Sequence, residues 1–190
     1  TVFVMEHELI SLKTNMTQLP VNICHSEPKG LYVPKKESIG IIVGGNNSTY
    51  TMQPSVIKKI LTVIKKSFHT YEIAITTSPR TPKEIEAIIE EFNFDYAVIY
   101  SKNKDNPIAD FLFTCKRVFI TEDSTSMISE AACFGTADIE IIPLETNNQQ
   151  NKYRRFVKNL AQNNYVHLFD GTMENTQKFP LHQALTKAMQ

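Results

Sequence analysis

One segment of the chain carries residues suited to binding an anion. It runs from Thr121 to Gly135 and directly follows the apolar run Val118–Ile120. A buried strand would therefore end in a polar turn, and a helix would begin at once. The hydroxyl and backbone N–H groups of Ser124, Thr125, Ser126 and Met127 would lie at the N-terminus of this helix, where anions bind favourably. Glu130 follows one to two turns later, on a face that can look back at the same crevice.

These residue types suit a nucleotide. Donors at the helix start would bind a diphosphate, and the carboxylate would accept hydrogen bonds from ribose hydroxyls. The alternative is a helix that Ser, Thr and Asp side chains simply cap. Glu122 and Asp123 also allow two interpretations, as metal ligands or as partners of the helix dipole, and their position favours the second. We therefore expect no metal and no bound cofactor.

The composition indicates a globular domain of 190 residues, 42% hydrophobic and 21% charged. Twenty basic and twenty acidic residues cancel, which predicts no nucleic-acid partner. No apolar run approaches the ~20 residues that span a bilayer, and no secretory signal is recognisable. The cysteines, Cys24, Cys115 and Cys133, lack metal-site spacing and favour reduced thiols in a cytoplasmic protein. Because the first residue is Thr1, we expect a processed chain or a fragment of a longer one.

Apolar runs alternate with amphipathic segments along most of the chain. The pattern predicts strands at 38–43, 71–77, 95–100, 117–121, 139–143 and 166–169. It predicts helices at 54–66, 82–92, 107–115, 124–134, 151–162 and 181–189, with Pro82 at the first helical position. The alternation indicates an α/β fold, a doubly wound parallel sheet of the Rossmann-like kind, over residues 38–190. Residues 1–37, strand-like at 1–5 and otherwise irregular, would be a lead that is a linker or the remnant of an N-terminal domain.

Two polar loops should meet at the ligand position of this topology. In the strand order 3-2-1-4-5-6, the first and fourth strands are neighbours and their connections leave in opposite directions. Gly44, Gly45 and Asn46 follow the first strand, and Thr121 begins the loop after the fourth. Glycines would let the backbone approach a phosphate, or would simply form a tight turn. Arg80, after the second strand, could pair with a phosphate or be a solvated surface residue.

The full glycine fingerprint of dinucleotide-binding proteins is absent, so the loop after the first strand gives little support to an NAD-type function. An epimerase or dehydrogenase would need that fingerprint and a Tyr/Lys pair. We therefore do not favour dinucleotide chemistry.

Four motifs in sequence order resemble a known family. They are Gly44–Asn46 after a strand, Thr76–Pro82 (TTSPRTP), Asn106–Pro107, and Thr121–Ala131 (TEDSTSMISEA). Together they resemble the mitochondrial-fission family of the elongated-mitochondria type, and the resemblance covers residues 38–190. The turn at 134–137 lacks the proline that is usual in the family.

The resemblance implies the C-terminal domain of a GT-B-type fold, in which two Rossmann-like domains enclose a cleft and this domain holds a nucleotide-sugar donor. It places Gly44 and Gly45 near the diphosphate, with Arg80 as a further phosphate ligand. Ser124 to Met127 would present the helix N-terminus, Glu130 would accept from the ribose, and Gly135 would end the helix. The acceptor site and any general base would come from a missing N-terminal domain, so no catalytic residue is assigned and this chain alone is expected to be inactive.

Two functions remain open at this point. The first is a metal-independent glycosyltransferase, in which N–H groups and Arg80 stabilise the leaving diphosphate. The second is a non-enzymatic adaptor of the mitochondrial-fission type that kept the pocket and lost the reaction. Lys58, Lys59, Lys65 and Lys66 could bring the adaptor to an anionic membrane surface, although a solvated helix face explains them as well.

Overall fold

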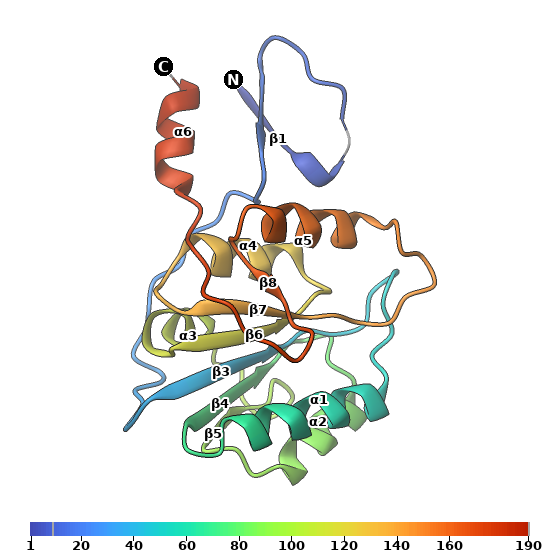
Figure 1. Cartoon of the computed structure of the whole chain (residues 1–190), viewed down its shortest axis with the longest axis vertical. Helices are drawn as coiled ribbons and strands as arrows, with labels where there is room; N and C mark the ends of the chain where they lie inside the picture. Colours follow the sequence, from blue (N-terminus) through green and yellow to red (C-terminus); the bar gives the residue numbers. More distant parts are fainter. Residues whose placement is uncertain (9, 190) are drawn as a thin grey trace.

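The computed structural model describes residues 1–8 and 10–189. Its centre is a parallel sheet of six strands in the order β5-β4-β3-β6-β7-β8 (Figure 1). The strands are β3 Ser38–Val43, β4 Glu72–Thr77, β5 Tyr96–Val98, β6 Arg117–Thr121, β7 Asp138–Ile142 and β8 His167–Leu168. This order confirms the predicted doubly wound α/β topology, with β3 and β6 as neighbours at the centre.

Helices cover both faces of the sheet. Helices α1 (Pro54–Ser67) and α2 (Lys83–Glu91) pack on one face, and α3 (Ile108–Thr114), α4 (Thr125–Cys133) and α5 (Lys152–Gln162) pack on the other (Figure 1). All six residues of β3 are buried, as expected for a central strand covered on both sides. The crossovers therefore send the chain to opposite faces after β3 and β6, as the site prediction requires.

Several element ends differ from the prediction. Pro82 precedes α2 in an extended conformation, with a ψ of 144°, and the helix begins at Lys83. Strand β5 spans three residues rather than six, because it is the edge strand and pairs only with β4. Gly135 lies just beyond α4 at a φ of +75°, in the left-handed conformation that often follows a helix end.

The first 37 residues contain regular structure that the sequence did not predict. Strand β1 (Val2–Met5) pairs in parallel with β2 (Met16–Leu19), and a 3-10 helix, η1 (Glu6–Glu8), follows β1. The expectation of an irregular stretch after residue 5 is therefore wrong at β2. Four residues of mixed polarity carry no local strand signal, and the strand exists because β1 supplies its partner.

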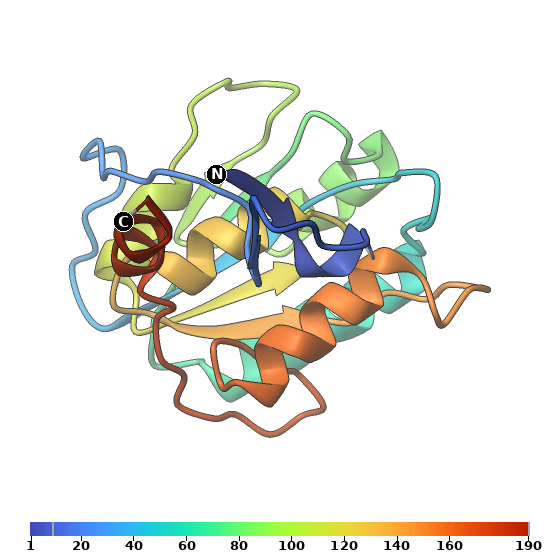
Figure 2. The same ribbon diagram turned by 90° about the horizontal axis from the view of Figure 1, so that it is seen from above.

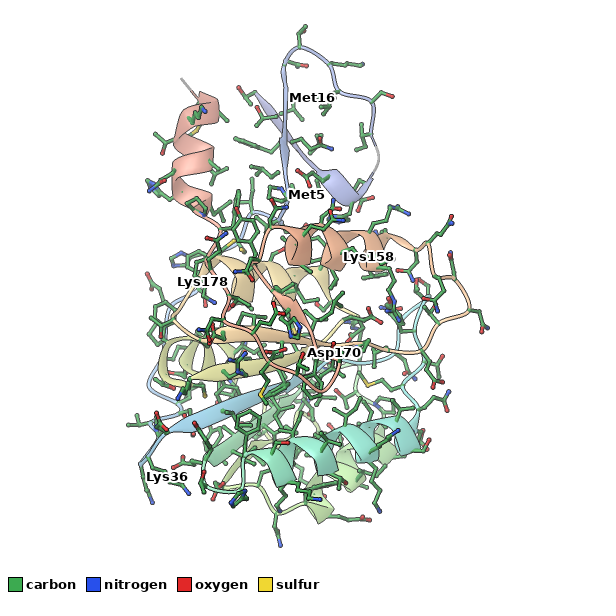
Figure 3. All side chains as sticks on the ribbon, in the orientation of Figure 1. Met5, Met16, Lys36, Lys158, Asp170 and Lys178 are labelled. Atoms are coloured by element: carbon green, nitrogen blue, oxygen red, sulfur yellow. The ribbon has the colours of Figure 1, made fainter. Side chains whose placement is uncertain are left out.

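The β1–β2 pair stands apart from the main sheet, beside the C-terminal helix α6 (Leu181–Met189) (Figures 1 and 2). Figure 3 shows Met5 and Met16 on these two strands. Thr1 Oγ1 donates to Ala188 O at 3.1 Å, and Asn159 Nδ2 of α5 donates to Glu6 Oε2 at 3.2 Å. The two ends of the chain thus lie together over the α4–α5 side of the sheet.

None of the helices in the described ranges, 1–8 and 10–189, combines the length and apolar character needed to cross a bilayer.

Candidate functional site

A cavity of about 310 Å³ lies at the carboxyl ends of β3 and β4, and we call it the cleft. One wall comes from α4 and another from the segment after β5. Its lining residues are Ile42, Val43, Thr76, Thr77, Ser78, Pro79, Tyr100, Lys104, Asp105, Asn106, Ile108, Ser126, Met127 and Glu130. The cleft occupies the switch point of the topology, where ligands of open α/β sheets commonly bind.

The N-terminus of α4 borders the cleft. Ser124 Oγ accepts a hydrogen bond from Met127 N at 3.4 Å and so caps the helix. Thr125 Oγ1 accepts from Asn22 Nδ2 at 3.1 Å, which directs this hydroxyl toward the N-terminal lead. Ser126 and Met127 line the cleft itself. The first N–H groups of a helix have no acceptor within the helix, so this end of α4 suits an anion.

Glu130 lies on the cleft-facing side of the same helix. Ser26 Oγ donates to Glu130 Oε1 at 2.7 Å, and the carboxylate retains its other oxygen as an acceptor. Burial raises the pKa of Glu130, while the Ser26 hydrogen bond and the nearby His25 and Lys29 oppose that rise. A half-buried carboxylate at this place can accept hydrogen bonds from the hydroxyls of a ligand.

Asp123 joins the three loops that follow β3, β4 and β6. Its side chain is fully buried and pairs with Arg80 Nη2 at 3.1 Å. Gly45 N donates to Asp123 Oδ2 at 2.9 Å, and Thr121 Oγ1 donates to Asp123 Oδ1 at 2.6 Å. Burial raises the pKa of Asp123, against the effect of these donors. The predicted meeting of the loops after β3 and β6 is therefore confirmed, and Asp123 is the residue that links them.

Gly44 and Gly45 allow these loops to approach one another. A Cβ on Gly44 would lie 2.2 Å from the Asp123 carboxylate oxygens, and one on Gly45 would lie 2.1 Å from the carbonyl carbon of Arg80. Asn46 uses its side-chain oxygen to accept from Met52 N at 2.8 Å. The missing side chains of the glycines thus make room for protein atoms, and their contact with a diphosphate stays a prediction.

The predicted site residues fall into two groups. Ser126, Met127 and Glu130 line the cleft. The others, Gly44, Gly45, Asn46, Arg80, Ser124 and Thr125, form the loops and the helix cap beside it. Arg80 is 44% exposed at its side chain but directs its guanidinium to Asp123.

Glu122 does not face the cleft. It is buried, accepts from Leu144 N at 2.6 Å and pairs with Arg154 at 3.0 Å. Burial raises its pKa, and the Leu144 and Arg154 contacts oppose the rise. The carboxylates of Glu122 and Asp123 therefore bind neighbouring loops and arginines, whereas the sequence favoured them as partners of the helix dipole. Across the described part of the chain, no three His, Cys, Asp or Glu side chains converge as a metal centre would require.

Some cleft residues were not singled out from the sequence. Lys104 Nζ lies 3.6 Å from the centroid of the Tyr100 ring, in cation–π contact at the cleft wall. Tyr100 ends the strand predicted at 95–100 and Lys104 follows it, and this position was the available signal. Ser26 had no signal, because it reaches Glu130 from 104 positions earlier in the chain.

A larger hollow, of about 750 Å³, lies between α1 and the ends of β7 and β8. Val56, Ile60, Val63 and Phe169 contribute apolar surface to it, and Lys59 contributes a charge. None of the predicted site residues lines this hollow. The convergence of a helix N-terminus and a carboxylate distinguishes the smaller cleft as the candidate site.

The fold and the cleft define a Rossmann-like α/β domain with a ligand-sized cavity at its topological switch point. The chain belongs to the mitochondrial fission ELM1 family, whose model it matches over residues 20–190. An uncharacterised protein of Rickettsia prowazekii (strain Madrid E), RP120, is 27% identical over 162 residues, which cover 80% of this chain and 45% of that protein. The chain thus spans less than half the length of this relative.

Two solved structures are similar to the chain in backbone. The peptidyl-cysteine decarboxylase EpiD has a TM-score of 0.49 and 13% identity, with 82% of this chain and all of that chain covered. A variant of EpiD in complex with its substrate peptide has the same TM-score and coverage at 11% identity.

Proposed function

We propose that this chain is the donor-binding domain of a metal-independent glycosyltransferase of the GT-B type. The cleft would hold a nucleotide sugar, with its diphosphate at the start of α4 and its ribose at Glu130. The observation that carries the proposal is the joint presence of the α4 N-terminus and Glu130 in one cavity at the switch point.

The contacts around the cleft support these assignments in different ways. Ser124 Oγ already accepts from Met127 N, so the N–H groups of Thr125 and Ser126 are the ones that would bind an oxyanion at the start of α4. The leaving diphosphate of a glycosyl transfer gains negative charge, and preorganised N–H donors stabilise such charge without a metal. Removal of one such donor typically costs about 2.7–4 kcal/mol of barrier.

Arg80 fits this function as a positioning residue. Its pairing with Asp123 neutralises part of its charge and holds the loops after β3, β4 and β6 together. Because the guanidinium remains partly exposed, it can add a hydrogen bond to a phosphate while it keeps the carboxylate. The acceptor site and the general base would come from a further domain, for which a relative more than twice as long as the matched segment leaves room.

An adaptor function has one observation in its favour. Five of the nine exposed large apolar side chains in the described residues belong to the first 37 residues: Val2, Ile10, Leu12, Ile23 and Val33. Val2, Ile10 and Leu12 belong to the β1–β2 segment, and exposed apolar side chains gathered on one segment are typical of a surface that another protein domain covers. A second domain of the same enzyme would cover it equally well, so this observation does not separate the two functions, and the binding of a nucleotide sugar is the property that favours the enzyme.

Thermal unfolding with UDP-, GDP-, ADP- and CMP-linked sugars tests the proposal. A ligand at a hundred times its dissociation constant stabilises the fold by about 2.7 kcal/mol, or about 5–11 °C for a domain of this size. Glu130→Ala should abolish the shift for the one nucleotide class that binds. Glu91→Ala removes an exposed carboxylate on α2 and should leave the shift unchanged.

The absence of any shift, in this chain and in a longer chain with the N-terminal domain, would overturn the enzyme proposal and favour the adaptor. A shift that Glu130→Ala does not reduce would place the ligand elsewhere, for example in the larger hollow beside α1.

A further inference from the structure

The N-terminal lead runs along α4 and is held to it at two points. Asn22 N donates to Ser129 Oγ at 2.9 Å, and Ser26 Oγ donates to Glu130 at 2.7 Å. Cys24 lies midway between these two attachments. Its backbone is therefore held against the helix from both sides.

Cys133 is the last residue of α4 and lies one turn after Ser129, on the same side of the helix. The Cys24 and Cys133 thiols are near enough for each to shift the pKa of the other, and the Asn22 and Ser26 attachments keep Cys24 beside this helix. Both side chains are partly exposed and line a cavity of about 430 Å³, which small reagents can enter. Cys115, by contrast, is buried under β3 beside the Ser38 hydroxyl at 3.5 Å.

The two thiols have different environments. The neighbouring Cys133 thiol lowers the pKa of Cys24, whereas the same contact and burial raise the pKa of Cys133. Lys178, labelled in Figure 3, lies near the pair and donates to Ala131 O and Ala137 O at 2.8 Å. A thiolate is the reactive form of cysteine, so the lower pKa favours Cys24 as the nucleophile of the pair and Cys133 as the resolving thiol.

We propose that Cys24 and Cys133 form a reversible disulfide that fastens the N-terminal lead to α4 beside the cleft. The oxidant is a low-molecular-weight disulfide, such as oxidised glutathione. The Cys24 thiolate attacks one sulfur, the S–S bond of glutathione breaks, and one glutathione thiolate leaves. Cys133 loses its proton to solvent and attacks the Cys24 sulfur, and the second glutathione thiolate leaves. Two protein thiols are oxidised to one disulfide, and oxidised glutathione is reduced to two glutathione molecules.

The disulfide would affect the cleft because each cysteine lies only a few residues along the chain from one partner of the Ser26–Glu130 hydrogen bond. Cys24 is two residues before Ser26, and Cys133 is three residues after Glu130. Oxidation would therefore hold the Ser26–Glu130 contact in place, and reduction would leave it to its single hydrogen bond. The proposal depends on the lead and α4 alone and stands whether or not the cleft binds a nucleotide sugar.

Peptide mapping across a series of glutathione redox buffers tests the proposal. The chain is equilibrated with reduced and oxidised glutathione, quenched with acid and alkylated, and its peptides are analysed without reduction. A Cys24–Cys133 linked peptide should appear as the buffer becomes more oxidising and disappear when it is made reducing. The oxidised chain should also melt several degrees higher, because the bond closes a loop of roughly 100 residues.

Three variants sharpen the result. Cys133→Ser should accumulate a glutathione adduct on Cys24, whereas Cys24→Ser should leave Cys133 largely unmodified. Cys115→Ser is the control and should form the same linked peptide as the original chain. The proposal is overturned if the original chain yields only separate glutathione adducts at the most oxidising ratio, or if Cys115 appears in the linked peptide.

Discussion

A single methyl group added at Gly44 tests whether Asp123 holds the loops of the cleft together. In Gly44→Ala, the new Cβ would lie 2.2 Å from the Asp123 carboxylate oxygens, whereas ordinary contact begins at 3.4 Å. The carboxylate would therefore have to retreat by about 1.2 Å, the difference between these two distances. Gly44 does not have a positive φ, so the cost of alanine there is steric rather than conformational.

This displacement would break two hydrogen bonds that the buried Asp123 carboxylate accepts. The bonds from Gly45 N at 2.9 Å and Thr121 Oγ1 at 2.6 Å would both exceed hydrogen-bonding distance. A hydrogen bond to a charged group contributes about 1.5–3 kcal/mol. With partial relaxation, we expect Gly44→Ala to lower the free energy of unfolding by about 3–5 kcal/mol, or the melting temperature by about 6–20 °C.

Urea unfolding followed by circular dichroism measures this change. Gly30→Ala is a suitable control, because no atom lies within 4 Å of its new Cβ. Its φ of +72° predicts a conformational cost of only about 1–2 kcal/mol. In an Asp123→Ala background, the Gly44 substitution should cost less than about 1 kcal/mol, because the clashing carboxylate is gone. A loss below about 0.5 kcal/mol for Gly44→Ala alone, or full additivity with Asp123→Ala, would refute the reasoning.

Three further predictions concern the packing of the domain. Glu140→Ala should cost about 1.5–3 kcal/mol in urea unfolding, because the Arg117 guanidinium, only 11% exposed, loses its fully buried partner and keeps Asp138, at 3.3 Å, as its remaining ion-pair partner. Glu91→Ala, from an exposed pair, should cost less than about 1 kcal/mol, and equal losses would contradict the reasoning. Ser124→Ala should remove the α4 cap and cost about 1 kcal/mol, with no change expected if the cap is unimportant. Burial lowers the pKa of Lys178 to about 8, against 10.5 in the unfolded chain, so the folded state binds fewer protons between these values. The free energy of unfolding of the original chain, relative to that of Lys178→Met, should therefore rise from pH 8 to 10.5 by up to about 1 kcal/mol per pH unit. A difference that does not change with pH would contradict a lowered pKa at Lys178.

The sequence by itself was sufficient for the parallel sheet, and the common strand order of this fold class gave the order that the structure confirms. Helices cover both faces of strand β3, so its residues are all buried. A strand buried in this way is a continuous apolar run, which can be recognised in the sequence without knowledge of its partners. The alternation of these runs with amphipathic helices then determines the crossovers, and hence the place where the loops after β3 and β6 meet. Four motifs, at 44–46, 76–82, 106–107 and 121–131, indicated the family. The match of the family model over residues 20–190 bears this out.

Only the tertiary structure determined which polar groups meet. Asp123 accepts from Gly45, 78 positions away, and Ser26 reaches Glu130 across 104 positions. Strand β2 forms because β1 lies beside it, and Cys24 and Cys133 line one cavity because the lead follows α4. Polar residues in loops have no periodicity that reports their partners, and a short strand depends on the strand it pairs with. These contacts arise only when the folded sheet brings distant segments together.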